Sequence, residues 1–365
     1  MTVNKQSTDK GSAPVHYVIW DLGPGGMELG ILHYIDHFGP GRKLYVYGIK
    51  ARENRVFDEN RILVGKGGLQ PGNAYLNYFK YCRKYRKAVF HLNNGGPVIL
   101  LLTLLAGVVN PVYHIHGTIY WKTPVQKIYL KASWWAVRLL MIFRKVTFVA
   151  NSGYSASVFQ DKVFPADTRQ VYNGFDTGRF IARRSRRKAL RKMAYIGRLQ
   201  TGKNVDMVVR LFEKAAADRP ELELHIAGSG PLKEQIDRRC AESPYADRIT
   251  CHGFVSDIDV FYGEMDLFVF LSAYESFGNV VAEALLTGLP VLTSNVPAFR
   301  EIHGGDGAFD LGDPSDYPGV ERRFLHALDH YPELADKAYE LSAEMGARFS
   351  VASHLSQITA IYEKL

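Results

Sequence analysis

Cysteine is scarce in this sequence, and long apolar runs are missing. The cysteines are three in number and far apart, at Cys82, Cys240 and Cys251, so they predict neither a disulfide scaffold nor a zinc site. The longest uncharged apolar stretch, 98–109, is about half the ~20 residues that a membrane-spanning helix needs. Residues 1–14 lack the apolar segment of a signal peptide and are expected to form a disordered lead. Together these absences favour a reducing, cytoplasmic setting.

Acidic residues are absent between Glu59 and Asp161, where thirteen Lys and Arg stand. The net charge is +8, but residues 1–182 carry 23 Lys and Arg against 10 Asp and Glu, and the remainder carries 22 against 27. Within that remainder a basic cluster of seven runs through 183–192. This asymmetry indicates an anionic partner or surface for the first half of the chain.

Two segments with helical periodicity carry many of these charges. In 73–87 four cations are spaced to share one helix face beside tyrosines: Lys80, Arg83, Lys84 and Lys87, with Tyr78, Tyr81 and Tyr85. In 123–145 the spacing assigns one stripe to the core: Ile128, Ala132, Trp135, Leu139 and Ile142. A different face then carries Lys127, Lys131, Trp134, Arg138, Met141 and Lys145. Such a basic face with Trp and Met is typical of a helix on anionic lipid, and a merely solvated cationic face is the alternative.

Strand and helix patterns alternate from Val15 onward, which indicates an α/β fold of two doubly wound domains. We expect an N-terminal domain over 15–180, a basic connector over 181–192, a C-terminal domain over 193–345 and a final helix over 346–365. The strands expected in the first domain are 15–23, 43–49, 88–94, 111–117, 145–152 and 169–176. Those expected in the second are 192–199, 221–231, 248–255, 267–276, 290–295 and 307–313.

In open parallel sheets ligands bind at the carboxyl ends of the strands, so the loops there are informative. After the strand at 192 come Gly197, Arg198 and Lys203, two cations around a turn that suit a diphosphate. After the strand at 221, Gly228 and Gly230 form a turn that would leave backbone N–H groups open to a ligand. Each pattern alone also fits an ordinary loop.

The segment 271–295 is more specific, because two carboxylates flank the start of a helix. Glu275 lies in the loop and Glu283 about two turns into the helix. Between them the first turn offers the unpaired amides of a helix N-terminus, at Phe277, Gly278, Asn279 and Val280. Because the carboxylates would repel a phosphate, they are expected to accept hydrogen bonds from hydroxyls on either side of a diphosphate. That arrangement describes a nucleotide sugar.

The glutamates in ESFGNVVAEAL resemble the signature of family 4 retaining glycosyltransferases of the GT-B fold. The similarity continues in GPGGMELG, HIHG, FVANSGYS, VYNGFDTGRF, YIGRLQTGKN, HIAGSGPL and FREI. It implies two Rossmann-like domains facing each other across a cleft, with the final helix crossing back to the first. No metal is implied.

The resemblance also implies roles for single residues. Arg198 and Lys203 would clamp the donor diphosphate together with Gly197 and the amides of 277–280. Glu275 would contact the donor sugar and Glu283 the ribose. Gly25 and Gly26 would let the first-domain loop approach the donor, and His116 would lie beside the transferred sugar.

Two other patterns imitate metal sites. His114 and His116 share a strand face, but they lack a nearby Cys or Asp, so we expect His114 to be packed or hydrogen-bonded. Asp257 and Asp259 are expected to cap a helix start rather than to bind a metal.

The expected function is transfer of a sugar from a nucleoside diphosphate donor, with retention at the anomeric carbon and without a metal ion. A UDP-sugar is the expected donor, although no residue pattern specifies the base. The basic first domain favours a lipid-linked or anionic glycan acceptor held at the inner face of the plasma membrane, in polysaccharide synthesis. A soluble small-molecule or protein acceptor is the main alternative. Remote alternatives are a silent nucleotide-sugar sensor and a nucleic-acid-binding protein. Lys and Arg interleaved with Tyr and Trp would also suit nucleic acid, but nucleic-acid binding leaves Glu275, Glu283 and the acidic second half unexplained, so no nucleic-acid partner is expected.

Overall fold

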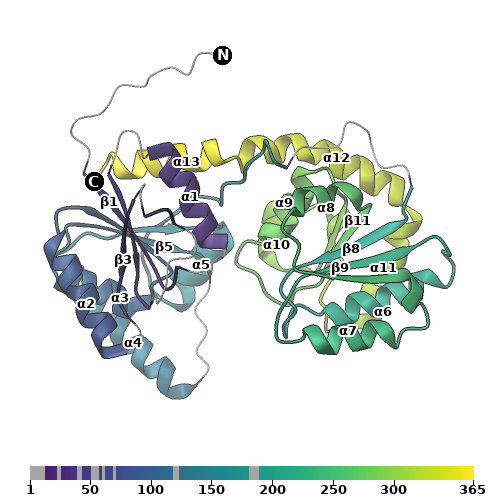
Figure 1. Cartoon of the computed structure of the whole chain (residues 1–365), viewed down its shortest axis with the longest axis horizontal. Helices are drawn as coiled ribbons and strands as arrows, with labels where there is room; N and C mark the ends of the chain where they lie inside the picture. Colours follow the sequence, from purple (N-terminus) through teal and green to yellow (C-terminus); the bar gives the residue numbers. More distant parts are fainter. Residues whose placement is uncertain are drawn as a thin grey trace, which may run out of the picture. The chain divides into compact units, whose positions relative to one another are not determined.

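The computed structural model describes residues 13–22, 26–38, 43–50, 57–59, 62–68, 71–117, 123–180 and 189–365. The chain divides into two compact units, each considered by itself (Figure 1). One unit comprises Met1–Tyr172 with His354–Leu365, and the other comprises Asn173–Ser353. The predicted connector at 181–192 lies mostly outside the described residues.

The first unit contains a seven-stranded sheet in the order β3-β2-β1-β4-β5-β6-β7, and every described pairing in it is parallel. The strands are β1 Val15–Ile19, β2 Leu44–Gly48, β3 Leu63–Lys66, β4 Val89–Asn93, β5 Asn110–Ile115, β6 Thr147–Ala150 and β7 Thr168–Gln170. All five residues of β1 and of β4 are buried, because helices cover both faces of a parallel sheet.

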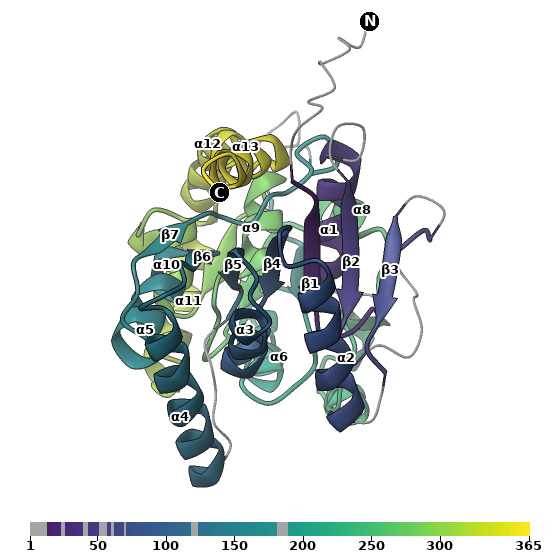
Figure 2. The same cartoon turned by 90° about the vertical axis from the view of Figure 1, so that its left-hand side faces the viewer.

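Helices flank this sheet on both sides (Figures 1 and 2). On one side lie α1 Gly26–Phe38 and, from His354 onward, α13 Val351–Tyr362. On the other side lie α2 Pro71–Lys84, α3 Gly96–Leu105, α4 Pro124–Leu140 and α5 Gly153–Lys162. Tyr34 of α1 contacts His354 of α13 through its hydroxyl, 2.5 Å from Nε2. The segment from His354 therefore completes the first unit.

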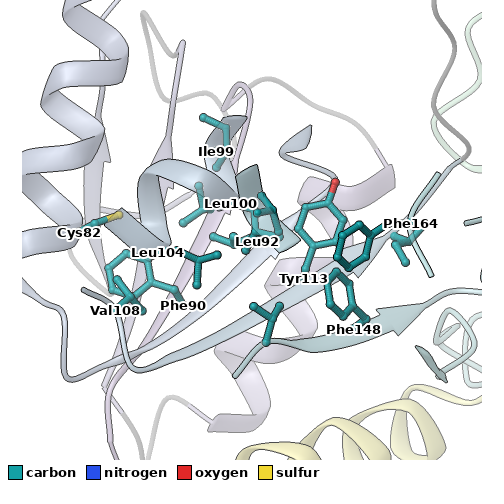
Figure 3. Close-up of a cluster of buried hydrophobic side chains, with 14 of the residues drawn as sticks. Cys82, Phe90, Leu92, Ile99, Leu100, Leu104, Val108, Tyr113, Phe148 and Phe164 are labelled. Atoms are coloured by element: carbon teal, nitrogen blue, oxygen red, sulfur yellow. The ribbon is translucent and has the colours of Figure 1, made fainter. Parts of the chain in front are cut away.

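The core of the first unit joins the central strands to the helices on the α3 side (Figure 3). Phe90 and Leu92 of β4, Tyr113 of β5 and Phe148 of β6 pack there against α3 and against Phe164. Cys82 of α2 is buried in the same cluster, where burial raises the pKa of its thiol to about 12. It is therefore a small apolar core residue rather than a reactive thiol.

The second unit contains a five-stranded parallel sheet in the order β10-β9-β8-β11-β12. Its strands are β8 Lys192–Ile196, β9 Glu223–Ala227, β10 Ile249–Gly253, β11 Leu267–Phe270 and β12 Val291–Thr293. Its helices are α6 Val205–Ala216, α7 Lys233–Ala241, α8 Ile258–Glu264, α9 Asn279–Leu286, α10 Pro297–Ile302, α11 Tyr317–Asp329 and α12 Tyr331–Arg348. The short 3-10 turns are η1 Ala246–Arg248 and η2 Gly307–Phe309.

One strand prediction was wrong, and one strand was missed. The segment 307–313, expected to be a strand, is the turn η2 followed by an isolated bridge between Thr293 and Asp310. Two backbone hydrogen bonds join it to the β12 segment, from Leu311 N–H to Thr293 O and from Asn295 N–H to Gly312 O. The pairing then ends, since Gly312 has φ +90° and its N–H donates to the Asp310 side chain. In the first unit β3 was not foreseen, because its four residues include Gly65 and Lys66 and lack a clear pattern.

The predicted face of α4 was also wrong. Trp134 is buried and packs on Phe164, with ring centroids 5.1 Å apart, and Val137 is buried on the same side. Trp135, assigned to the core, has 64% of its surface exposed, and Ile128 has 69%. The helix carries two apolar stripes with helical spacing, and periodicity alone does not tell which of them faces the sheet.

Tyr78 and Tyr81 of α2 face the sheet rather than lying beside the cations. Tyr85, just after the helix, does lie beside a cation, with Lys84 Nζ 5.1 Å from its ring centroid. Tyr78 is buried with its hydroxyl 2.7 Å from Thr103 Oγ1, and the Tyr81 hydroxyl lies 2.5 Å from His16 Nδ1. The side chains of Lys80, Arg83 and Lys84 are exposed as expected, whereas Lys87 lies beyond the end of the helix. None of the described helices has the length and apolarity to cross a membrane.

Candidate functional site

The strand order of the second sheet reverses between β8 and β11, which is where open parallel sheets bind ligands. Strand β9 pairs with one edge of β8, and β11 pairs with the other edge. The loop after β8 carries Arg198 and Lys203, and the loop after β11 carries Glu275. Topology therefore places the predicted cations and the first predicted carboxylate at one edge of the sheet.

Backbone contacts hold the two loops together. The N–H of Ala273 donates to Gly202 O at 2.8 Å, and Asn204 Nδ2 donates to Leu271 O at 2.7 Å. Asn204 adopts a left-handed conformation with φ +52°, which asparagine tolerates better than most residues. The position of Lys203, between Gly202 and Asn204, is therefore fixed relative to the loop that carries Glu275.

Lys203 forms an ion pair with Glu275. Its Nζ contacts Glu275 Oε1 and lies 3.3 Å from Ser272 Oγ. Both side chains are mostly covered, with 15% and 20% exposed. The ammonium also lies over the Phe270 ring, 5.5 Å from its centroid, a cation–π geometry. Lys203 is thus held in place before any ligand arrives.

Arg198 is arranged differently. It is exposed, and it forms no ion pair with an acidic side chain among the described residues. Tyr195, two positions along the chain from Gly197, donates its hydroxyl to Arg198 O at 3.2 Å and so supports the backbone there. Burial, and then the nearby charge of Glu275, raise the pKa of Tyr195, so its hydroxyl stays protonated. The guanidinium of Arg198 can therefore meet an anion without first breaking an ion pair.

Helix α9 begins at Asn279 beside this loop. Its N-cap, Gly278, has φ +100°, and a Cβ there would lie 2.6 Å from Phe299 Cε1, so the position requires glycine. The first hydrogen bonds within the helix are those of Val281 and Ala282 to Gly278 O. The amides of Asn279 and Val280 therefore have no acceptor inside the helix and suit an anion.

Two predicted residues of this turn, Phe277 and Asn279, have additional side-chain contacts. The Phe277 side chain is buried, with its ring 5.5 Å from Phe349 and 6.1 Å from Phe175. Asn279 Oδ1 accepts a 2.8 Å hydrogen bond from Asn173 Nδ2. These contacts fix the first turn of α9.

Glu283 lies on α9, and its Oε2 is 3.1 Å from the Tyr262 hydroxyl. Burial raises the pKa of Glu283 to about 7, although the Tyr262 hydrogen bond and the charge of Arg179 act to lower it. The same hydroxyl lies 3.0 Å from Val280 O. Because a tyrosine has one hydroxyl proton, Val280 O and the ionised carboxylate of Glu283 share it. Sequence reasoning did not single out Tyr262, since no pattern in 258–264 distinguishes it from a core residue.

The glycine turns at Gly228 and Gly230 bring backbones together, and the amide of Gly228 is already hydrogen-bonded. A Cβ at Gly228 would lie 1.9 Å from Gly197 O, and one at Gly230 would lie 2.4 Å from Leu199 O. The N–H of Gly228 donates to Gly253 O at 2.6 Å. The expectation that this amide is free for a ligand was therefore wrong.

In the first unit His116 follows β5. Its Nε2 lies 3.0 Å from Asn93 Oδ1, an acceptor, so this nitrogen carries the proton. Burial, and then the charge of His354, lower the pKa of His116 to about 3, so the imidazole is neutral at ordinary pH. His114 is buried with Nδ1 2.9 Å from His91 Nε2, which confirms that it is packed and hydrogen-bonded. Gly26 begins α1, and Gly25 lies outside the described residues.

Within the described ranges no group of three or more His, Cys, Asp or Glu could hold a metal ion. Asp257 stands at the N-cap of α8, but its side chain accepts no capping hydrogen bond. Asp259 instead forms an ion pair with Arg179, with 2.7 Å between Oδ1 and Nε. The capping role was therefore wrong for Asp257, whereas the Asp259 carboxylate lies in the first turn of α8 and also accepts hydrogen bonds from the backbone of Asp259 and Val260.

The chain is similar to known glycosyltransferases in sequence and in structure. Residues 179–309 match the family model of glycosyl transferases group 1, a range that covers β8 to α10 and thus the candidate donor-site residues from Gly197 to Glu283. Among solved structures the chain is similar to HepE of Anabaena in complex with UDP, with a TM-score of 0.77, 18% identity, and 96% and 100% of the two chains covered. It is also similar to WaaG, a glycosyltransferase involved in lipopolysaccharide biosynthesis, with a TM-score of 0.71, 14% identity, and 93% and 99% covered.

The fold is therefore that of the GT-B glycosyltransferases. The resemblance to family 4 is confirmed, and residues 179–309 are a glycosyl transferases group 1 segment.

Similar curated proteins are transferases and synthases of sugars. The lipopolysaccharide core biosynthesis mannosyltransferase LpsB of Rhizobium meliloti is 27% identical over 62% of this chain and 67% of its own length. The mannosylfructose-phosphate synthase of Agrobacterium fabrum is 31% identical over 42% of this chain and 35% of its own length. The chain thus spans about two thirds of the first of these relatives and about one third of the second.

Proposed function

We propose that this protein transfers a sugar from a nucleoside diphosphate sugar to an acceptor hydroxyl, with retention at the anomeric carbon and without a metal ion. The observation that carries the proposal is the meeting of Arg198, Lys203, the α9 N-terminus and Glu275 at the switch point of the second sheet. Cations and amides suit a diphosphate, and carboxylates suit the hydroxyls of the sugar and the ribose.

In this mechanism the diphosphate gains negative charge as its bond to the sugar breaks. Lys203 and the amides of Asn279 and Val280 are fixed in place, so they stabilise that charge with little reorganisation, and the exposed Arg198 adds a second cation. Glu275 holds Lys203 until the donor binds and then accepts a hydrogen bond from a sugar hydroxyl. Glu283 accepts one from the ribose once it is ionised.

No side chain is assigned as nucleophile or base. In our proposal the acceptor hydroxyl attacks on the face that the diphosphate leaves, and a departing phosphate oxygen takes its proton. For His116 we keep the role that the resemblance implies, a place beside the transferred sugar. Its ring proton is bonded to Asn93, so the other ring nitrogen of the neutral imidazole is an acceptor.

For the donor we propose a UDP-sugar, which the UDP complex of HepE supports by similarity. For the acceptor we propose a lipid-linked or anionic glycan at the cytoplasmic face of the membrane, in cell-surface polysaccharide synthesis. The similarity to LpsB and the acid-free basic segment between Glu59 and Asp161 support this choice. Acceptance of a soluble compound instead would favour the main alternative.

Two measurements test the proposal. Thermal-shift screening with UDP-, GDP- and ADP-sugars should give one base a clearly larger stabilisation, because a ligand that binds only the folded state raises its melting temperature. Slow release of nucleoside diphosphate from that donor by purified protein should follow. Stabilisation without any release would identify a sensor rather than a transferase. Stabilisation by nucleic acid alone would refute both.

A further inference from the structure

Helix α4 and the turn after it present an apolar face to solvent. The exposed fractions of its large apolar side chains are 75% for Val125, 69% for Ile128, 56% for Tyr129, 64% for Trp135, 43% for Leu139, 72% for Ile142 and 82% for Phe143. We call Ile128, Trp135, Leu139, Ile142 and Phe143 the α4 face. In both views α4 reaches beyond the other helices of the first unit (Figures 1 and 2). Contiguous exposed apolar surface of this kind marks an interaction site.

The opposite side of the helix already supplies its contact with the core. Trp134 packs against Tyr113, Phe159 and Phe164, with ring centroids 5.1 to 5.6 Å away, and Val137 is fully buried. The α4 face therefore contributes nothing visible to the packing of the first unit. Its side chains require another reason to be apolar.

Cations border the α4 face. Five exposed ones lie on the same helix and turn: Lys127, Lys131, Arg138, Arg144 and Lys145. Arg138 and Lys145 also line a pocket of about 430 Å³ at the carboxyl end of α4, where Arg169 and the carboxylate of Asp167 complete the charged groups. None of Arg138, Lys145 and Arg169 forms an ion pair with an acid within the part of the chain that the structure describes.

We propose that the α4 face docks on an anionic lipid bilayer. Its apolar side chains enter the interfacial region, the bordering cations meet lipid phosphates, and the pocket receives one headgroup. A second copy of this chain is a poor occupant, because it would bring the same five cations against these five. The surface differs from the one that sequence periodicity suggested, since Trp134 is buried and Trp135 takes its place.

This inference rests on the proposed function only for its purpose, which is to bring the transferase to a membrane-held acceptor. The docking itself requires neither donor nor acceptor. Membrane binding and donor turnover can therefore fail separately in the same preparation.

The test is flotation of the full chain with vesicles of phosphatidylcholine alone or mixed with phosphatidylglycerol. The native protein should float only with the mixed vesicles, and increasing salt should weaken its binding. The triple variant Ile128→Ser, Trp135→Ser, Ile142→Ser should bind at least about tenfold more weakly, because three large apolar groups no longer leave water. The charge variant Lys127→Gln, Lys131→Gln, Lys145→Gln should lose the preference for phosphatidylglycerol.

The matched control is Phe254→Ser with Val260→Ser, which removes exposed apolar side chains from the second unit, 81% and 57% exposed. It should float as the native protein does. All variants should keep the native melting temperature and the donor turnover, since the changed side chains are exposed and none belongs to the donor site.

Equal recovery of the native protein with both vesicles, or native flotation of the triple variant, would overturn the inference while leaving the proposed function intact. A lipid-free dimer that the triple variant abolishes would assign the α4 face to a second copy and would equally overturn it. Loss of donor turnover with flotation unchanged would contradict the proposed function alone.

Discussion

Lys203 and Glu275 form an ion pair across the loops that follow β8 and β11. The pair holds a cation at the point where a diphosphate is expected, and it places a carboxylate directly beside it. A carboxylate repels a phosphate and a cation attracts it, so the two partners should affect the affinity for the diphosphate in opposite ways.

Replacing Lys203 by Ala should lower the rate of donor turnover about 100-fold to 1,000-fold, because one fixed positive group is lost from the departing diphosphate. Steady-state release of nucleoside diphosphate measures this loss. Lys233→Ala is the matched control, since Lys233 lies in the same unit and pairs with Asp237 on its own helix. Native turnover of Lys203→Ala would remove the clamp from the mechanism.

Replacing Glu275 by Gln should leave the affinity for the free nucleoside diphosphate unchanged or tighter, since a repelling charge is removed. The turnover number should fall about tenfold or more, because a contact to the transferred sugar is weakened. Calorimetric titration with UDP and steady-state kinetics separate the two effects. A parallel loss of UDP affinity would show that Glu275 serves mainly to position Lys203.

The raised pKa of Glu283, about 7, predicts a pH dependence with a definite sign. The folded state holds this proton above the ordinary pKa of 4.5, so its contribution to stability is complete below pH 4.5 and is lost as the pH rises through 7. Donor affinity should change the other way and rise with pH, because the ionised carboxylate accepts the ribose hydrogen bonds.

Between pH 5 and 8, the free energy of unfolding and the donor affinity should both vary with pH in the native protein. Both should stay flat in Glu283→Gln. Tyr262→Phe offers a sharper check. It removes a hydrogen bond that lowers the pKa of Glu283, so the midpoint should move to higher pH. A midpoint that stays in place would mean that Tyr262 does not act on Glu283.

Replacing Gly278 by Ala should destabilise the second unit by about 2 to 4 kcal/mol, because φ is +100° and the new Cβ would lie 2.6 Å from Phe299 Cε1. Gly288→Ala is the matched control. Its φ is also positive, +67°, but its Cβ would meet nothing closer than 3.7 Å, so about 1 kcal/mol is expected. Urea unfolding measures both variants. Equal losses would show that the contact with Phe299 is relieved easily.

Buried histidines predict that the first unit is sensitive to acid. Burial lowers the pKa of His16 and of His354 from 6.5 to about 4. The folded state therefore binds fewer protons, and the stability from these groups is complete above pH 6.5 and is lost as the pH falls towards 4. The His16 ring stacks on those of Tyr45 and Phe90, with ring centroids 4.4 and 4.9 Å apart. A phenylalanine should therefore fit in the place of His16.

Between pH 7 and 4 the free energy of unfolding should therefore fall less steeply for His16→Phe than for the native protein. His330→Gln provides the control, since that side chain is exposed. An unchanged slope for His16→Phe would assign the acid sensitivity to other groups.

Sequence reasoning reached the second-unit site because its signals are local. Lys203 and Glu275 each follow a strand whose apolar run is unmistakable, and parallel topology then brings the two loops together. The pairing of these two side chains was not foreseen. Pairing depends on the side-chain geometry of two loops about 70 positions apart, which spacing within either loop does not determine.

The errors have a common cause in tertiary contacts. On α4 both apolar stripes satisfy the helical period, and only Tyr113, Phe159 and Phe164 decide that Trp134 faces inward. The role of Tyr262 likewise depends on Glu283, which is 21 positions away. At Gly228 the sequence indicated a turn correctly, but the neighbouring strand takes up its amide.

The hydroxyl of Tyr362 lies 2.9 Å from that of Tyr17 and 2.5 Å from His91 Nδ1, so two strands near the start of the chain depend on α13 for hydrogen-bond partners. A ribosome makes Tyr17 and His91 long before it makes Tyr362, with the whole second unit in between. The first unit therefore cannot finish folding during its own synthesis, and nascent chains released before α13 should be the ones that chaperones and proteases recognise.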